Sequence, residues 1–312
     1  MDGNVREVLT VIGEALVDLV DDGEGATFAA HLSGSPLNVA VGLARLERPT
    51  EFMARFSQDT FGRRLRGFAE RNAVRLSAAV DAAQASTLAV VNLDEQGKAS
   101  YDFYIEGSAD WQWTPDELRV PDGTQILHTG SLASWLPPGD EHIVAALGRA
   151  RDTVLVSYDP NVRPSLLGTP ERARPLIERA IPIAHLVKAS EDDVAWLYPS
   201  DRLDDVARRW LDLGATAVIL TRGEDGAVAY RGTADPITRP GRPVRLVDTI
   251  GAGDAFTSGL LSALAGAGVH DADMLAGADL GAALDEAILV AALTCERAGA
   301  DPPTAAEVDA AR

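Results

Sequence analysis

The sequence predicts an α/β protein built on a doubly wound, mainly parallel sheet that helices cover on both faces. Short apolar runs recur along the chain, and each ends in a polar or glycine-bearing cluster. Helical-length stretches separate these runs, and such an alternation is typical of a parallel sheet. With 312 residues and 46% hydrophobic content, the chain is long enough to bury a large core. We therefore expect one domain over residues 1–312, with a small β-sheet lid inserted in it.

The apolar runs and the stretches between them give the expected elements in order. The expected strands of the main sheet are Val8–Ile12 and residues 126–128, 154–156, 185–187, 217–220 and 244–247. The expected helices include residues 143–149, 171–180, 202–213 and 255–264. In such sheets ligands bind at the carboxyl ends of the strands, so functional side chains are expected in the polar clusters that follow these runs.

One region breaks the alternation of strands and helices. Residues 87–93 and 99–105 flank the turn-rich residues 94–97, and Phe103 and Ile105 fall on one face at period two, which predicts an antiparallel hairpin. The strand-like residues 15–20 are able to pair with it. We expect these segments to form a lid over about residues 15–31 and 86–107, which would exclude water from a site at the strand ends. The alternative is an ordinary surface hairpin of the main sheet.

The composition excludes several classes of partner. Lys and Arg number 28 against 47 Asp and Glu, and the net charge of -19 would repel nucleic acid and anionic lipid. Cys295 is the only cysteine, which excludes an internal disulfide and a cysteine-built zinc site. Neither an apolar signal-peptide core nor an apolar run of ~20 residues is present, so we expect a cytoplasmic protein. P-loop and dinucleotide-binding fingerprints are also missing.

The most informative local motif is the loop Asp248-Thr249-Ile250-Gly251-Ala252-Gly253-Asp254, which lies between an expected strand and an expected helix. Its glycines let the backbone approach a ligand, and amides at a helix start carry partial positive charge, so the loop predicts an anion hole. Asp254 would be kept ionised by the same dipoles and would accept a proton from a hydroxyl. The alternative is a helix cap in a tight turn.

This loop and the residues after it resemble the C-terminal signature of the ribokinase-like sugar kinases, also called the phosphofructokinase-B type. The resemblance implies a ribokinase-like fold and an enzyme that uses ATP and Mg²⁺. It makes Asp254 the catalytic base, and it makes the amides of Gly251, Ala252 and Gly253 the groups that stabilise the transferring phosphoryl group. Phosphoryl transfer depends on positioning and charge neutralisation, which such a loop supplies.

The resemblance extends to the N-terminal part of the chain, where Gly13-Glu14 and Asp18 are followed by Ser33-Gly34-Ser35-Pro36-Leu37-Asn38. It implies that Asp18, Gly34 and Asn38 hold sugar hydroxyls. Pro36 suits the first turn of a helix, with Ser35 as its cap. The alternatives are a solvated carboxylate for Asp18 and a helix-end hydrogen bond for Asn38. The family usually has glycine at four positions where this chain differs, namely Ser33, Glu47, Ala54 and Ser57.

Two motifs in the middle of the chain resemble strand-end motifs of the family. The run Asp159-Pro160-Asn161-Val162-Arg163 implies that Asn161 and Arg163 line the space between sugar and phosphate, although such a sequence is also a common turn. Lys188-Ala189-Ser190-Glu191-Asp192-Asp193 lies where relatives carry an Asn-x-x-Glu motif. It implies that Lys188 and Ser190 contact nucleotide and that Asp193 holds magnesium through water; a helix cap is an equally good account.

The remaining nucleotide contacts are implied by the C-terminal third of the chain. The turn Thr221-Arg222-Gly223-Glu224-Asp225-Gly226 resembles the family's phosphate turn and implies contacts from Thr221, Gly223 and Gly226; the alternative is a plain αβ turn. The resemblance places Ala292 and Cys295 beside adenine, with Cys295 as a packing residue. It also implies a monovalent cation, K⁺, at a carboxylate like Asp248.

Several stretches resemble bacterial fructokinases in particular, among them Tyr101-Asp102-Phe103-Tyr104 in the lid, so fructose is the first choice of substrate and Phe103 an expected sugar contact. The alternatives are 2-keto-3-deoxygluconate or another sugar or sugar acid, a nucleoside-type acceptor, and a sugar-binding relative that has lost catalysis. Relatives often dimerise through their lids, and an exposed apolar hairpin predicts a homodimer here.

Overall fold

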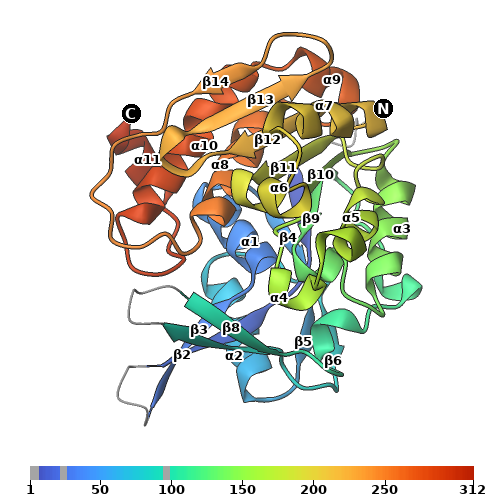
Figure 1. The fold of residues 1–312 in the computed structure, drawn as a ribbon. Helices are drawn as coiled ribbons and strands as arrows, with labels where there is room; N and C mark the ends of the chain where they lie inside the picture. The colour runs from blue at the N-terminus through green and yellow to red at the C-terminus, as the bar shows by residue number, and fades with distance from the viewer. Residues whose placement is uncertain (1–6, 22–26, 94–98) are drawn as a thin grey trace, which may run out of the picture.

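The central sheet lies in the middle of the molecule (Figure 1). The computed structural model describes residues 7–21, 27–93 and 99–312. Eight strands of the described chain form this sheet. In spatial order they are β14 (Ile237–Arg239), β13 (Ala227–Arg231), β12 (Ala217–Thr221), β11 (Leu186–Ser190), β10 (Leu155–Asp159), β9 (Thr124–Gly130), β1 (Val8–Ile12) and β4 (Thr50–Met53). The strands from β4 to β12 pair in parallel, and β13 and β14 join antiparallel at one end, so the predicted mainly parallel sheet is confirmed.

Helices cover both faces of this sheet because successive strand residues point to opposite sides. Leu155, for example, packs into one core cluster and Val156 into the other. The first face carries α1 (Ser35–Arg45), α2 (Thr60–Arg71), α8 (Ala252–Gly266), α9 (Ala272–Gly277) and α10 (Leu280–Cys295). The second carries α3 (Asp140–Ala150), α5 (Pro170–Glu178), α6 (Glu191–Leu197) and α7 (Leu203–Leu213). This double winding agrees with the predicted fold class.

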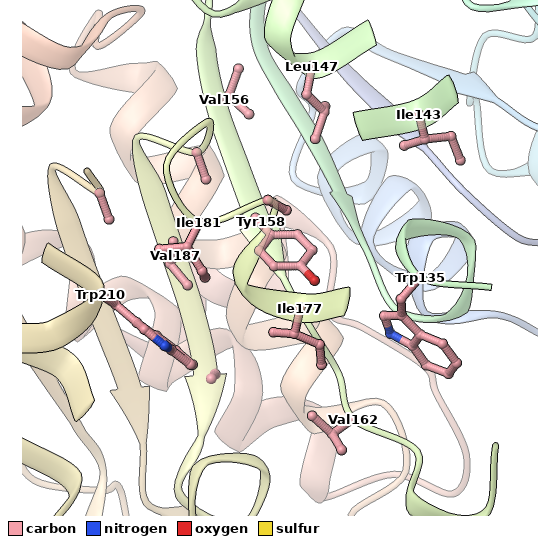
Figure 2. Packing of buried hydrophobic residues seen from close by; sticks show 14 of the residues in the cluster. Trp135, Ile143, Leu147, Val156, Tyr158, Val162, Ile177, Ile181, Val187 and Trp210 are labelled. Atoms are coloured by element: carbon pink, nitrogen blue, oxygen red, sulfur yellow. The ribbon is translucent and has the colours of Figure 1, made fainter. Parts of the chain in front are cut away.

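The core on the second face is rich in aromatic side chains. Figure 2 shows Trp135, Tyr158 and Trp210 in this cluster, with aliphatic side chains such as Ile177 and Val187 beside them. All five are buried to 2% exposure or less. Burying an aromatic or large aliphatic side chain stabilises the fold by ~2 kcal/mol, so this cluster fixes the strands whose ends carry the polar clusters.

A second, smaller sheet projects from the body of the molecule (Figure 1). It has the order β3 (Phe28–Ser33), β2 (Leu16–Asp21), β7 (Leu88–Leu93) and β8 (Ala99–Tyr104). β7 and β8 pair antiparallel, as predicted, and β2 joins β7 in parallel. Because this sheet is separate, the alternative of a hairpin within the main sheet is wrong. The predicted turn at residues 94–97 and the side chain of Tyr101 lie outside the described residues.

Two local expectations are wrong. Residues 244–247 form no strand; Leu246 and Val247 are 63% and 52% exposed, so no ladder buries them. The cap of α1 is Gly34 rather than Ser35, whose hydroxyl donates to Asp254 instead. The last helix is α11 (Ala305–Ala311), which Thr304 caps and Val308 anchors in the core.

The described residues include no helix of the length and apolar character that a membrane crossing requires.

Candidate active site

A cavity of about 290 Å³ lies between the small sheet and the body of the molecule, beside the start of α8. Its lining includes most of the residues predicted to handle sugar and phosphoryl group, namely Asp18, Gly34, Asn38, Phe103, Arg163, Gly251 and Asp254. A larger cavity of about 620 Å³ lies around Gly123 and Arg149, at the amino ends of β9 and β10, and contains none of the predicted site residues. The smaller cavity is therefore the candidate site.

The loop before α8 is held in a shape that only glycine fits well. Gly251 has a φ of 76°, and a Cβ there would lie 2.6 Å from the Cβ of Ala300. Asp248 fixes the start of the loop, because its carboxylate accepts hydrogen bonds from the amides of Ile250 (3.0 Å) and Gly299 (2.8 Å). The helix then begins at Ala252. The Ala252 amide donates to the Thr249 carbonyl oxygen at 3.2 Å, so the amides of Gly253 and Asp254 are the ones that remain for an anion in the first turn of α8.

Asp254 lies in the first turn of α8 and is held by two side chains from the start of α1. Its Oδ1 accepts a hydrogen bond of 2.6 Å from the Ser35 hydroxyl, and its Oδ2 accepts one of 2.8 Å from Asn38 Nδ2. Burial raises the pKa of Asp254, while Ser35, Asn38 and the charge of Lys188 oppose the rise. The sequence predicted only the ionising effect of the helix dipole. A raised pKa suits a general base that works near neutral pH.

Lys188 and Asp159 form a buried ion pair beside the loop. The Lys188 ammonium donates to Asp159 Oδ2 at 2.8 Å, and both side chains are at most 7% exposed. Burial alone lowers the pKa of Lys188, but Asp159, Asp193 and Asp254 together raise it. Lys188 Nζ lies 3.4 Å from the point where a Cβ on Gly253 would be, so its charge lies beside the loop that the sequence predicted as an anion hole. Our sequence prediction did not include Asp159 in the site.

Asp193 is the third residue of α6 and forms a capping box with the N-cap residue Ser190, which agrees with the alternative to a metal role. The amides of Val162 and Ser190 donate to its two carboxylate oxygens at 3.1 and 3.3 Å, and the Ser190 hydroxyl accepts from the Asp193 amide. Burial raises the pKa of Asp193. Each carboxylate oxygen can accept a further hydrogen bond, which fits a group that holds metal-bound water. Among the described residues no three acidic, histidine or cysteine side chains group as direct ligands.

The cavity is lined by side chains of opposite charge from two parts of the chain, Asp18 and Arg163. Burial raises the pKa of Asp18, and a hydrogen bond from Ser33 and the charges of Arg163 and His31 oppose the rise. Arg163 donates to Asn161 Oδ1 at 2.7 Å. Asn161 does not line the cavity itself but fixes Arg163, which does. A carboxylate and a guanidinium that face one space suit the recognition of hydroxyl groups.

The predicted nucleotide residues other than Gly251 lie outside the cavity lining. Residues 222–226 join the antiparallel strands β12 and β13, so the alternative of a plain αβ turn is wrong. A Cβ on Gly223 would meet open space, whereas one on Gly226 would lie 2.1 Å from the Arg239 carbonyl oxygen. Gly226 is therefore required by packing, and Gly223 leaves room for a ligand.

The end of α10 packs against the loop before α8. The carbonyl of Cys295 accepts hydrogen bonds from the amides of Val247 and Asp248, at 2.9 and 3.2 Å. Burial raises the pKa of the half-buried Cys295 thiol, which disfavours the reactive thiolate. Ala292 lies one turn earlier in α10. The thiol group of Cys295 therefore suits the packing role that the sequence predicted.

The four departures from the family pattern differ in their surroundings. Glu47 adopts a φ of 58° just after α1, a conformation that glycine takes at less cost. Ala54 is fully buried, and Ser57 lies in β5 (Arg55–Ser57), whose partner is β6 (Val80–Ala82). The Ser33 side chain contributes a hydrogen bond to Asp18. Only Ser33 touches the candidate site.

Fold and site together define an α/β enzyme of the phosphotransferase class. Free helix amides and a lysine can neutralise a phosphoryl group, and a carboxylate lies where a hydroxyl would bind.

Comparison with known proteins identifies the family: residues 6–306 match the pfkB family of carbohydrate kinases, and the chain belongs to it. The fructokinase of Klebsiella pneumoniae is 38% identical over 265 residues, which cover 84% of this chain and 85% of that protein. A fructokinase from Xylella fastidiosa, solved with bound ATP, has a TM-score of 0.90 and 26% identity over 98% of both chains. A double mutant of the Vibrio cholerae fructokinase, solved with fructose, ADP and potassium ion, has a TM-score of 0.85 and 28% identity over 99% of both chains.

Proposed function

We propose that this carbohydrate kinase phosphorylates fructose, with ATP as the donor and Asp254 as the general base. The observation that carries the proposal is the position of Asp254, which lines the sugar cavity, lies in the first turn of α8 and is held by Ser35 and Asn38. The similarity to fructokinases supports fructose as the acceptor. The parts form a single ribokinase-like domain over residues 1–312, with the small sheet as its lid.

The proposed reaction is direct transfer of one phosphoryl group. A hydroxyl of fructose attacks the γ-phosphorus of ATP, the bond from that phosphorus to the bridging oxygen breaks, and ADP leaves. Asp254 takes the proton of the attacking hydroxyl. The amides of Gly251, Ala252 and Gly253 stabilise the transferring group, and Lys188 adds positive charge beside them. Asp18, Gly34, Asn38, Phe103 and Arg163 hold the sugar, and Asn161 holds Arg163.

We assign the nucleotide and the ions to residues beside the sugar cavity. We place the nucleotide against Lys188, Ser190, Thr221, Gly223, Gly226, Gly251, Gly253, Ala292 and Cys295. Asp193 would hold magnesium through water, and the ion would neutralise charge on the phosphate oxygens. Asp248 is the carboxylate proposed for K⁺. Activity in potassium compared with sodium salts tests that assignment, and an enzyme indifferent to the choice would contradict it.

A panel of acceptors tests the proposed substrate. Purified protein with ATP and Mg²⁺ is given fructose, other hexoses, ribose, 2-keto-3-deoxygluconate or a nucleoside, and ADP formation is followed. We expect the highest kcat/KM with fructose. A higher value with the sugar acid would reassign the substrate within the family, and ADP release with none of them would remove the kinase proposal in favour of a binding protein.

Two further assignments complete the proposal. Exposed Phe28 and Tyr104, at 49% and 64%, lie on the lid and support a homodimer formed through the lids. A mass by light scattering equal to one chain would contradict the dimer. The charge of -19 and the single cysteine are consistent with a cytoplasmic enzyme, which fractionation of cells that express the chain would test.

A further inference from the structure

Asp110 is a buried acidic residue at the base of the small sheet, and the proposed reaction assigns it no role. It lies in the short 3-10 helix η1 (Ala109–Trp111) and is 1% exposed. Its chain neighbours belong to the body of the molecule. Trp111 packs in the core on the second face of the main sheet, and the Ala109 carbonyl accepts a hydrogen bond from Arg55 Nε at 3.0 Å. Asp110 is therefore attached to the body rather than to the small sheet.

Both carboxylate oxygens of Asp110 bind the chain where it enters the small sheet. Oδ1 accepts a hydrogen bond of 2.9 Å from the amide of Ala15, directly before β2. Oδ2 accepts one of 2.5 Å from the hydroxyl of Thr87, directly before β7. Ala15 and Thr87 are 3% and 0% exposed, so these bonds are shielded from water. Hydrogen bonds to a carboxylate are stronger than those between neutral groups. One side chain therefore ties the neighbouring strands β2 and β7 to the body at their first residues.

The register of the small sheet places two proposed sugar contacts close to these attachment points. Ala89, two positions after Thr87, pairs with Asp18 of β2 on one side and with Phe103 of β8 on the other. Asp18 and Phe103 both line the cavity. Side chains at paired positions of neighbouring strands project to the same face of a sheet. A shift of β2 or β7 at its base would therefore move both side chains relative to Asp254.

We propose that Asp110 is a positioning residue for the sugar, which holds the small sheet where Asp18 and Phe103 line the cavity. This inference rests on the proposed function, because that function makes Asp18 and Phe103 sugar contacts. The cost of burying the carboxyl group supports the inference. Burial raises the pKa of Asp110 to about 6, although the hydrogen bonds from Thr87 and Ala15 oppose the rise. A buried acid kept against this cost is suited to fixing the geometry of its neighbours.

The first test compares Asp110→Ala with the wild-type enzyme. KM for fructose, KM for ATP and kcat are measured, with the fructose Kd by calorimetry. We expect fructose KM and Kd to rise roughly 10-fold, as they would if only about a tenth of the molecules kept the productive placement of the small sheet. KM for ATP should change less than about twofold, because the proposed ATP contacts lie outside the small sheet. The value of kcat should fall less than about threefold, because saturating fructose restores the placement.

Substitutions of Thr87 separate its hydrogen bond from its packing. Thr87→Val removes the hydroxyl and should raise fructose KM by roughly threefold, less than Asp110→Ala does, because the bond to the Ala15 amide remains. Thr87→Ser keeps the hydroxyl and should leave fructose KM within about twofold of wild type. The double variant Asp110→Ala/Thr87→Val should resemble Asp110→Ala, because the two residues act through one hydrogen bond, whereas independent effects would multiply.

Hydrogen exchange reports on the small sheet directly and needs no turnover. In Asp110→Ala without sugar, the amides of β2 and β7 should exchange roughly 10-fold faster than in wild type, while those of β10 and β11 keep their rates. Glu51→Ala is the matched control. Glu51 is also a buried acid, at 3% exposure, and it bonds the Ser77 hydroxyl and the Ala78 amide, which lie outside the small sheet. Its loss should lower the melting temperature and leave fructose KM and the exchange of β2 and β7 unchanged.

Four results would overturn the inference: an unchanged fructose KM and Kd in folded Asp110→Ala, an equal rise in KM for ATP, equal effects of Thr87→Val and Thr87→Ser, or multiplicative effects in the double variant. Circular dichroism establishes that each variant is folded, and the Thr87 pair decides the matter if Asp110→Ala does not fold. Failure of the proposed function looks different, because the wild-type protein itself would then neither bind nor phosphorylate fructose. In that event the inference falls with it.

Discussion

The substitution Glu14→Gln should remove a pH-dependent loss of stability. Burial raises the pKa of Glu14 from its ordinary value of 4.5 to about 7. The folded protein therefore holds the proton more tightly than the unfolded chain does. The contribution of the Glu14 carboxyl group to folding stability is fully present below about pH 4.5 and is lost as the pH rises through about 7. The rise corresponds to about 3 kcal/mol in total, of which about 2 kcal/mol is lost between about pH 5.5 and 8.

The free energy of unfolding, measured by urea denaturation between pH 5.5 and 8, checks this prediction. Wild-type stability should fall by about 2 kcal/mol more over this range than the stability of Glu14→Gln, whose amide does not titrate. Asp110, whose pKa is also raised by burial, to about 6, is present in both proteins and largely cancels from the difference. Equal slopes in the two proteins would show that Glu14 is not a buried, protonated acid near neutral pH.

Three other substitutions test separate parts of the structure. Lys188→Met leaves Asp159 buried without its partner and should cost ~3–5 kcal/mol in unfolding free energy as well as most of kcat; a stable, active variant would contradict the buried pair. Gly34→Ala places a Cβ 2.6 Å from the Glu14 carbonyl oxygen at a φ of 120°, so the melting temperature should fall and fructose KM should rise; wild-type values would refute the close approach. Glu47→Gly relieves a φ of 58° and should raise stability by about 1 kcal/mol in urea unfolding, with no gain from Glu47→Ala.

The parts of the fold that local sequence determines were predicted well. Val8–Ile12 is a continuous apolar run, and it is β1 with the same bounds, because strands buried on both faces consist of such runs. The loop at 251–254 was also predictable, since its glycines and carboxylate are adjacent in the chain. Residues 244–247 have a similar local pattern but no neighbouring strand to pair with, which local sequence does not reveal.

The side-chain contacts within the site were less predictable, because they join distant parts of the chain. Ser35 and Asp254 are 219 positions apart, and Lys188 and Asp159 are 29 apart. Ser35 has the features of a helix cap, and only the three-dimensional arrangement shows that its hydroxyl reaches Asp254. The ends of β10 and β11 bring Asp159 and Lys188 together, and adjacency of these strands is the signal that would have paired them.

The central claim is that Asp254 removes a proton from a sugar hydroxyl as phosphate is transferred to it. The most direct measurement is single-turnover transfer of labelled γ-phosphate to fructose by Asp254→Asn, with the fructose Kd of the variant measured by calorimetry. We predict a loss of ~10²-fold or more in the transfer rate and a Kd within a few-fold of wild type, because a general base typically contributes ~10²–10⁴-fold and the amide still accepts a hydrogen bond from Ser35. A transfer rate equal to that of wild type would contradict the claim.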